Sequence, residues 1–183
     1  MRDPRTTASA LLDAAEAEFN AAGFEGTDTN RIARRAGYAP QTFYRHFDDK
    51  IAIFVAVYER WWTQESDALT ALLRAPRPDL SKVGDAMIAF HAKWRGFRRS
   101  LRHLATANPR VRAARARARK AQIAGARLFM PGQGDGEIAA ALLVFERLCD
   151  AVAENEFADM GLPRAAGRAA VMAAIASALT PAR

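Results

Sequence analysis

Residues 27–50 read TDTNRIARRAGYAPQTFYRHFDDK, and the residues that start and end helices within this stretch decide the fold that we expect. A first helix is expected to start at Thr27 or Thr29, whose hydroxyl group can accept a hydrogen bond from an unpaired amide of the first turn. Gly37 favours the left-handed conformation that ends helices, and Pro40 suits the first turn of a second helix. The stretch therefore predicts two short helices joined by a tight turn.

The second helix is expected to extend through Phe47, with its two rings buried and its polar side chains exposed. Phe43 and Phe47 are four residues apart and therefore share the inward face of a helix. The side chains left on or near the outer faces are those of Gln41, Thr42, Tyr44, Arg45 and His46. Arginine can neutralise a DNA phosphate, glutamine and threonine can read base edges, and tyrosine can do either. We therefore expect DNA contact here; the alternative is that Tyr44 is half-buried beneath the helix that precedes this stretch.

Three segments together resemble the DNA-binding module of the tetracycline-repressor (TetR/AcrR) family of transcriptional regulators: FNAAGFEGT (19–27), IARRAG (32–37) and TFYRHFDDK (42–50). The resemblance covers approximately residues 8–58 and implies an all-α fold of about nine helices. It implies a three-helix helix-turn-helix DNA-binding domain at residues 1–48, joined to an effector-binding and dimerisation domain, a helical bundle, at residues 49–183. The DNA-binding residues that it implies are Thr27, Gln41, Thr42, Tyr44, Arg45, His46 and the phosphate-contacting Lys50.

The entry into the second helix departs from the family pattern. Where the family typically has a small aliphatic residue followed by serine or threonine, this chain has Tyr38 and Ala39, so a side-chain cap is missing. The loss of such a cap costs about 1 kcal/mol, and Pro40 offsets part of this cost by fixing the first turn. The departure supports an alternative interpretation, in which the chain is a helical adaptor or ligand-binding protein that has lost specific DNA binding.

Composition narrows the class of protein. The 183 residues include no apolar run near the roughly 20 residues that span a bilayer, and the N-terminus lacks the apolar core of a secretion signal. The single cysteine, Cys149, excludes an internal disulfide and a multi-cysteine metal site, and is interpreted as an apolar filler or a thiol sensor. We therefore expect a soluble, cytoplasmic protein without a metal or another cofactor.

The net charge of +7 is unevenly distributed. Residues 1–50 carry seven Lys/Arg against eight acids, but residues 29–47 hold four arginines and no acid, which suits contact with phosphates. Arg34 and Arg35 are interpreted either as phosphate clamps or as part of a solvated face. The basic segment 93–127 adds twelve Lys/Arg and no acid. It is a solvated surface, a site for an anionic effector or an unspecific phosphate contact.

Helical periodicity predicts one helix before the quoted stretch and six after it. Asp48 or Asp49 is expected to cap the first of these six, a long helix that connects the two domains. Because no flexible linker intervenes, this helix is the natural element to transmit a change between the domains. The expected helices are 7–22, 49–74, 79–94, 96–106, 109–129, 135–159 and 163–179.

Aromatic side chains recur after residue 60 at helical spacing, which by default indicates a hydrophobic core. Several large rings cannot all pack in one layer, so they also suit the walls of a small-molecule cavity, with His91 as a polar group. The resemblance implies that such a cavity binds an effector, which we expect to be anionic or aromatic. The candidate effector-binding residues are Trp61, Trp62, Phe90, His91, Trp94 and Phe145.

The last two helices are lined with small residues, among them Ala140, Ala151, Ala170 and Ala174. Such faces are either core or a self-complementary interface, and the resemblance implies a homodimer through these helices. Two recognition helices about 34–36 Å apart would read a palindromic operator in double-stranded DNA. We therefore expect a ligand-responsive regulator, a homodimeric repressor released from its operator by the effector.

An enzyme is not expected. Glu146, Asp150 and Glu154 form a row along one predicted helix, but no Glu-x-x-His pair accompanies them and the three histidines are scattered. A row of acids is more often an exposed face than a metal site.

Overall fold

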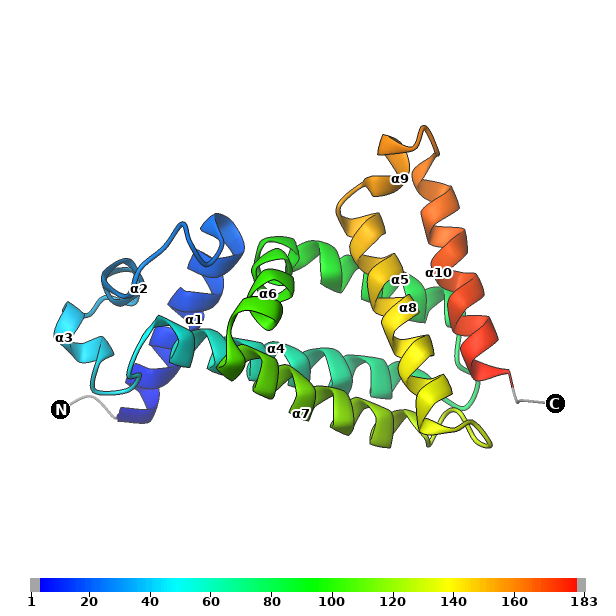
Figure 1. Ribbon diagram of the computed structural model, residues 1–183, viewed down its shortest axis with the longest axis horizontal. Helices are drawn as coiled ribbons and strands as arrows, with labels where there is room; N and C mark the ends of the chain where they lie inside the picture. The colour runs from blue at the N-terminus through cyan, green and yellow to red at the C-terminus, as the bar shows by residue number, and fades with distance from the viewer. Residues whose placement is uncertain (1–3, 181–183) are drawn as a thin grey trace. The chain divides into compact units, whose positions relative to one another are not determined.

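The computed structural model describes residues 4–180, and the side chains from Thr6 onwards. Within residues 4–180 it consists of ten helices and no strands, which confirms the all-α prediction (Figure 1). The helices are α1 (Pro4–Ala22), α2 (Thr29–Arg35), α3 (Pro40–Phe43), α4 (Lys50–Leu73), α5 (Leu80–Lys93), α6 (Arg95–Ala107), α7 (Pro109–Ala126), α8 (Asp135–Ala153), α9 (Glu156–Asp159) and α10 (Arg164–Leu179). None of the described helices is long and apolar enough to cross a membrane.

One helix more than expected arises because the segment 135–159 is not continuous. Asn155 adopts a left-handed conformation with φ of 65°, which ends α8 and starts the one-turn helix α9. Asparagine tolerates this conformation better than most residues do. The prediction of a single helix over 135–159 was therefore wrong.

The chain divides into two compact units. The N-terminal unit contains the described residues up to Trp62 together with Gly96–Ala116, and the C-terminal unit contains Thr63–Arg95 and the described residues from Arg117 onwards. Compact packing and function need not divide a chain at the same place, so the predicted functional boundary after residue 48 stays a prediction.

The core of the N-terminal unit is built around aromatic rings. Phe19 of α1 and Phe54 of α4 have ring centroids 5.1 Å apart, and Phe54 lies 4.8 Å from Phe97 of α6. These three side chains are fully buried, and Ile32 of α2 and Phe43 of α3 are also fully buried. The short helices are thus held by apolar burial rather than by their own length.

The glycines and Asp49 act at the helix ends as expected. Helix α2 begins at Thr29, one of the two expected starts, but neither threonine caps it. Gly23 and Gly37 have φ of 73° and 78° after α1 and α2, and Asp49 Oδ1 accepts a hydrogen bond from Ala52 N in the first turn of α4 at 2.7 Å. The prediction of Thr27 or Thr29 as the cap of α2 was wrong. Asp28 is the cap, since its Oδ1 accepts from Arg31 N at 2.8 Å.

The core of the C-terminal unit lies between α5, α8 and α10. Its buried members are Val83, Met87, Ile88, Cys149, Val152, Val171 and Ile175. Cys149 is fully buried in this cluster, as expected of a small apolar filler. Part of the predicted small-residue lining of α8 and α10 is therefore core.

Candidate nucleic-acid interface

The helix-turn-helix is formed by α2, the turn at Gly37 and α3. Helix α3 ends at Phe43, so the expectation that it extends through Phe47 was wrong. Its N-cap, Ala39, makes no side-chain hydrogen bond, and after Phe43 the chain tightens into turns in which His46 N donates to Phe43 O at 3.0 Å. A start without a cap leaves a first-turn amide without that partner, and a helix this short has few internal hydrogen bonds to stabilise it.

The exposed side of α3 and of its following turn carries the polar residues that the sequence indicated. Phe43 is fully buried and Phe47 partly buried, whereas Gln41 and Arg45 are exposed and Thr42 and His46 are intermediate. The interpretation of Tyr44 as half-buried beneath α1 was wrong, since Tyr44 is 57% exposed.

Tyr44 is also oriented by a contact with α2. Its hydroxyl lies 3.0 Å from Thr29 Oγ1 in an exposed hydrogen bond. Its ring packs edge-on against Phe43, with centroids 5.3 Å apart. The side chain is therefore held at the surface of the helix-turn-helix rather than left free to rotate.

Two residues that were predicted to contact DNA have partners within the module. Thr27 is 4% exposed and its hydroxyl donates to Glu18 Oε2 at 3.0 Å, so its side chain is turned inward, and its contact with DNA stays a prediction. Lys50 Nζ donates to Phe24 O at 2.8 Å and Thr27 O at 3.0 Å, and lies 4.0 Å from the centroid of the Phe24 ring. Lys50 thus ties the start of α4 to the loop after α1; its phosphate contact stays a prediction.

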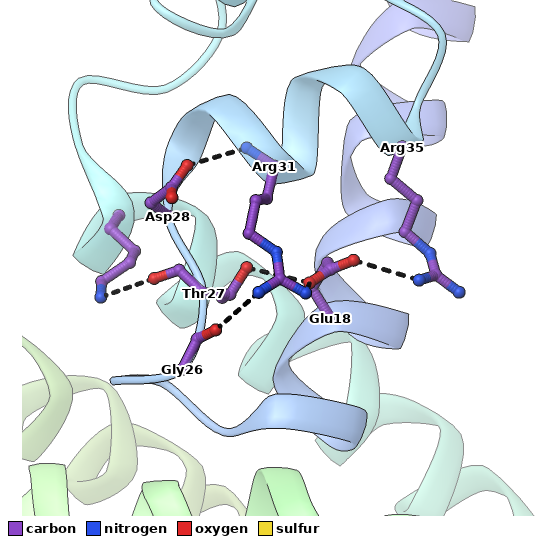
Figure 2. Close-up of polar contacts among 7 residues, drawn as sticks. Glu18, Gly26, Thr27, Asp28, Arg31 and Arg35 are labelled. Carbon is purple, nitrogen blue, oxygen red and sulfur yellow. Dashed lines mark hydrogen bonds and ion pairs between the residues drawn. The ribbon is translucent and has the colours of Figure 1, made fainter.

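Glu18 of α1 is the centre of a polar cluster that the sequence analysis missed (Figure 2). Its side chain is 8% exposed and pairs with Arg31 NH2 and Arg35 NH1, each at 3.1 Å. Burial alone would raise the pKa of Glu18, but hydrogen bonds from Arg35 and Thr27 and the charges of Arg31 and Arg35 outweigh it and lower the pKa. A sequence signal existed, because Glu18 follows Leu11 by seven residues and so shares its buried face.

The other two arginines of the helix-turn-helix are differently placed. Arg34 and Arg45 are exposed, and neither guanidinium has a recorded ion pair within residues 4–180. Arg34 and Arg35 therefore differ: Arg35 pairs with Glu18, whereas Arg34 does not. Whether either one contacts a phosphate stays a prediction.

The six predicted effector residues do not all belong to one unit. Trp61 and Trp62 lie in the N-terminal unit, where Trp61 is 3% exposed and Arg98 lies 4.8 Å from its ring centroid. The C-terminal unit contains the other four, Phe90, His91, Trp94 and Phe145. Their shared role in effector binding stays a prediction.

His91 is part of a buried polar group within the C-terminal unit. It is 1% exposed, with Nδ1 2.9 Å from Asp150 Oδ1 and Nε2 2.9 Å from Glu65 Oε1. The group joins α4, α5 and α8. Among the described residues, no cluster of histidine, cysteine or acidic side chains has a geometry that could hold a metal ion.

An open hollow of about 350 Å³ lies elsewhere in the C-terminal unit, between α5, α8 and α10. Ile88 and Val152 are its buried apolar members, and Asp85, Arg164 and Arg168 are its charged ones. None of the six predicted effector residues lines this hollow.

The basic segment 93–127 is partly neutralised by acids outside it. Arg110 NH1 pairs with Asp49 at 2.6 Å in the N-terminal unit, and Arg127 pairs with Asp135 at 2.7 Å in the C-terminal unit. Arg98 is buried, so the segment is not uniformly a solvated surface.

Comparison with known proteins agrees with this architecture. Residues 11–57 match the model of the family described as bacterial regulatory proteins, tetR family. A protein from Mesorhizobium loti assigned to the TetR-family transcriptional regulators is 22% identical, with a TM-score of 0.70 and coverage of 98% of each chain. Salmonella enterica GusR is 17% identical, with a TM-score of 0.68 and coverage of 98% of each chain.

The fatty acid degradation regulator FadR from Bacillus halodurans is 16% identical, with a TM-score of 0.65 and coverage of 94% of each chain. No curated protein matches the sequence. At these identities the solved structures show a common fold along nearly the whole chain.

Proposed function

Because the chain belongs, through residues 11–57, to the tetR family of bacterial regulatory proteins, we propose that it is a homodimeric transcriptional repressor that a small-molecule effector releases from a palindromic operator. The observation that carries the proposal is the exposed polar surface of α3 and its following turn. There Tyr44 is exposed and hydrogen-bonded to Thr29, and Gln41 and Arg45 are exposed with it. These are side chains that read base edges and neutralise phosphates.

A homodimer through α8 and α10 is supported by an apolar face on α8. Leu143 and Val144 are 56% and 52% exposed, and the exposed Ala140 lies at the spacing that continues the same face. Arg147, which pairs with Glu156, borders that face. Exposed alanines run along α10, and α8 and α10 pack side by side in the C-terminal unit. A paired copy would bury this face and supply the second recognition helix that a palindrome requires.

The effector is proposed to act by shifting a population between two arrangements of the recognition helices, which requires different affinities for the two. Helix α4 contributes residues to both compact units and is one candidate for transmission. Helix α6 is a second, because Asn20 Oδ1 at the end of α1 accepts from Gly96 N at 3.1 Å and from Phe97 N at 3.3 Å. Under this proposal residues 1–48 bind DNA and residues 49–183 bind the effector and dimerise.

The proposal is tested by binding of the purified protein to DNA fragments from beside its own gene, with excess unspecific competitor. We expect sequence-selective binding with two protomers per site, and loss of that binding in Tyr44→Ala without loss of the folded dimer. Tyr44→Phe keeps the ring and removes only the hydroxyl, so it separates the contribution of the ring to that binding from the contribution of the hydroxyl.

Binding that competitor DNA abolishes would favour the alternative, a helical adaptor or ligand-binding protein. The uncapped start of α3 at Ala39 is the observation that favours this alternative.

A further inference from the structure

We propose that Glu18 is a positioning residue of the DNA-binding surface. It holds Arg31 and Arg35 in ion pairs that link α1 to α2, and Arg34 and Arg45 are the arginines that neutralise DNA phosphates. This inference rests on the proposed function, because it assigns roles within the same surface.

The contacts of the Glu18 carboxylate show why Arg31 and Arg35 are retained (Figure 2). Oε1 accepts from Arg35 NH1 at 3.1 Å, and Oε2 pairs with Arg31 NH2 at 3.1 Å and accepts from Thr27 Oγ1 at 3.0 Å. Arg31 is fixed further by donation from NH1 to Gly26 O at 3.1 Å. A phosphate that took either guanidinium would leave a buried carboxylate with one donor fewer, which offsets the gain at the phosphate.

Arg34 and Arg45 carry no such cost. Arg34 lies about 100° around α2 from Arg35 and about 60° from Arg31, given 3.6 residues per turn, and so lies to one side of the line that faces Glu18. Arg45 directly follows the exposed Tyr44 in the turn after α3. Both are exposed, and no acidic partner of either is recorded within residues 4–180.

Charge bookkeeping leads to the same division. The two guanidiniums held by Glu18 share one buried negative charge, and neither can turn to a phosphate without the loss of a donor to that carboxylate. Arg34 and Arg45 contribute two positive charges that no recorded ion pair reduces. The number of phosphates that the module neutralises is therefore set by Glu18 as much as by the count of arginines.

The test is the salt dependence of binding to a fluorescently labelled duplex of unspecific sequence, combined with thermal unfolding of each variant of the full chain. Arg34→Gln and Arg45→Gln should each flatten the plot of log K against log salt by about 0.9 per protomer bound, at an unchanged Tm. Arg31→Gln and Arg35→Gln are matched controls, which should keep the slope and lower the Tm. Glu18→Gln should steepen the slope, because it frees two guanidiniums.

Flattening of the slope by Arg31→Gln or Arg35→Gln as large as that by Arg34→Gln would overturn the inference while leaving the proposed function intact. Absence of any duplex binding by the unaltered chain would overturn both. If Glu18→Gln fails to fold, the four arginine variants still decide the matter. All four arginines are exposed, so their substitution should leave the chain folded.

Discussion

Replacement of Gly96 by alanine should destabilise the N-terminal unit through a clash with the backbone of α1. A Cβ at residue 96 would lie 2.9 Å from the carbonyl carbon of Asn20 and closer still to its oxygen. The oxygen belongs to a helix backbone, so it cannot rotate away as the end of a flexible side chain could. Relief requires Asn20 to move, which also disturbs the hydrogen bonds from Gly96 N and Phe97 N to its side chain.

The size of the effect follows from two opposing terms. Overpacking of this kind costs about 1–3 kcal/mol, whereas alanine in a helix gains about 0.5–1 kcal/mol over glycine. Because the clashing atoms are backbone atoms, the upper part of that range applies, about 2–3 kcal/mol, and the net loss is about 1–2.5 kcal/mol. For a chain of 150–250 residues, each 1 kcal/mol shifts Tm by about 2–4 °C, so Gly96→Ala should lower Tm by about 2–10 °C.

The assay is thermal unfolding followed by circular dichroism, with Gly125→Ala as the matched control. Gly125 also lies in a helix, α7, but a Cβ there would meet nothing within 4 Å, so its substitution should raise the stability. A Tm for Gly96→Ala equal to or above that of the unaltered chain would refute the close contact between α1 and α6.

Three further predictions concern stability and assembly. Asp49→Ala removes the cap of α4 and should cost about 1 kcal/mol in denaturant unfolding, whereas Asp48→Ala should cost nothing measurable. Since the pKa of Glu18 is lowered below 4.5 in the folded state, its stabilisation is complete above that pH and is lost as the pH falls through the folded value; Glu18→Gln should remove that part of the acid sensitivity. Leu143→Glu should convert the proposed dimer into monomers in analytical ultracentrifugation, and a retained dimer would place the interface elsewhere.

The parts of this structure that could be predicted depend on local chemistry. Gly23 and Gly37 end helices because only glycine adopts a positive φ at little cost, and Asp49 caps α4 because its carboxylate reaches an amide three residues on. These signals need no knowledge of the rest of the chain. They were sufficient to predict the helix-turn-helix and most helix boundaries after it.

The parts that could not be predicted depend on contacts between distant residues. Helix α3 starts without a side-chain cap and gives way to turns after Phe43, and periodicity does not reveal that end. Thr27 has the side chain of a helix cap, but its hydroxyl donates a hydrogen bond to Glu18, nine residues earlier in the chain. His91 meets Glu65 and Asp150 from separations of 26 and 59 residues, so no local pattern announces that group.

The hydrogen bond between Thr29 and Tyr44 bears on how strictly an operator would be read. Each hydroxyl has one proton and two lone pairs, and either can be the donor across the 3.0 Å that separates them. Reversal of the bond changes Tyr44 from an acceptor to a donor toward a base without movement of any heavier atom. A base pair opposite Tyr44 would therefore be tolerated in several identities, whereas the amide of Gln41 presents a donor and an acceptor together and would favour a base edge that offers both, such as adenine. Selection of bound sequences from a randomised operator library should therefore return several bases at the position opposite Tyr44 and one preferred base at the position opposite Gln41.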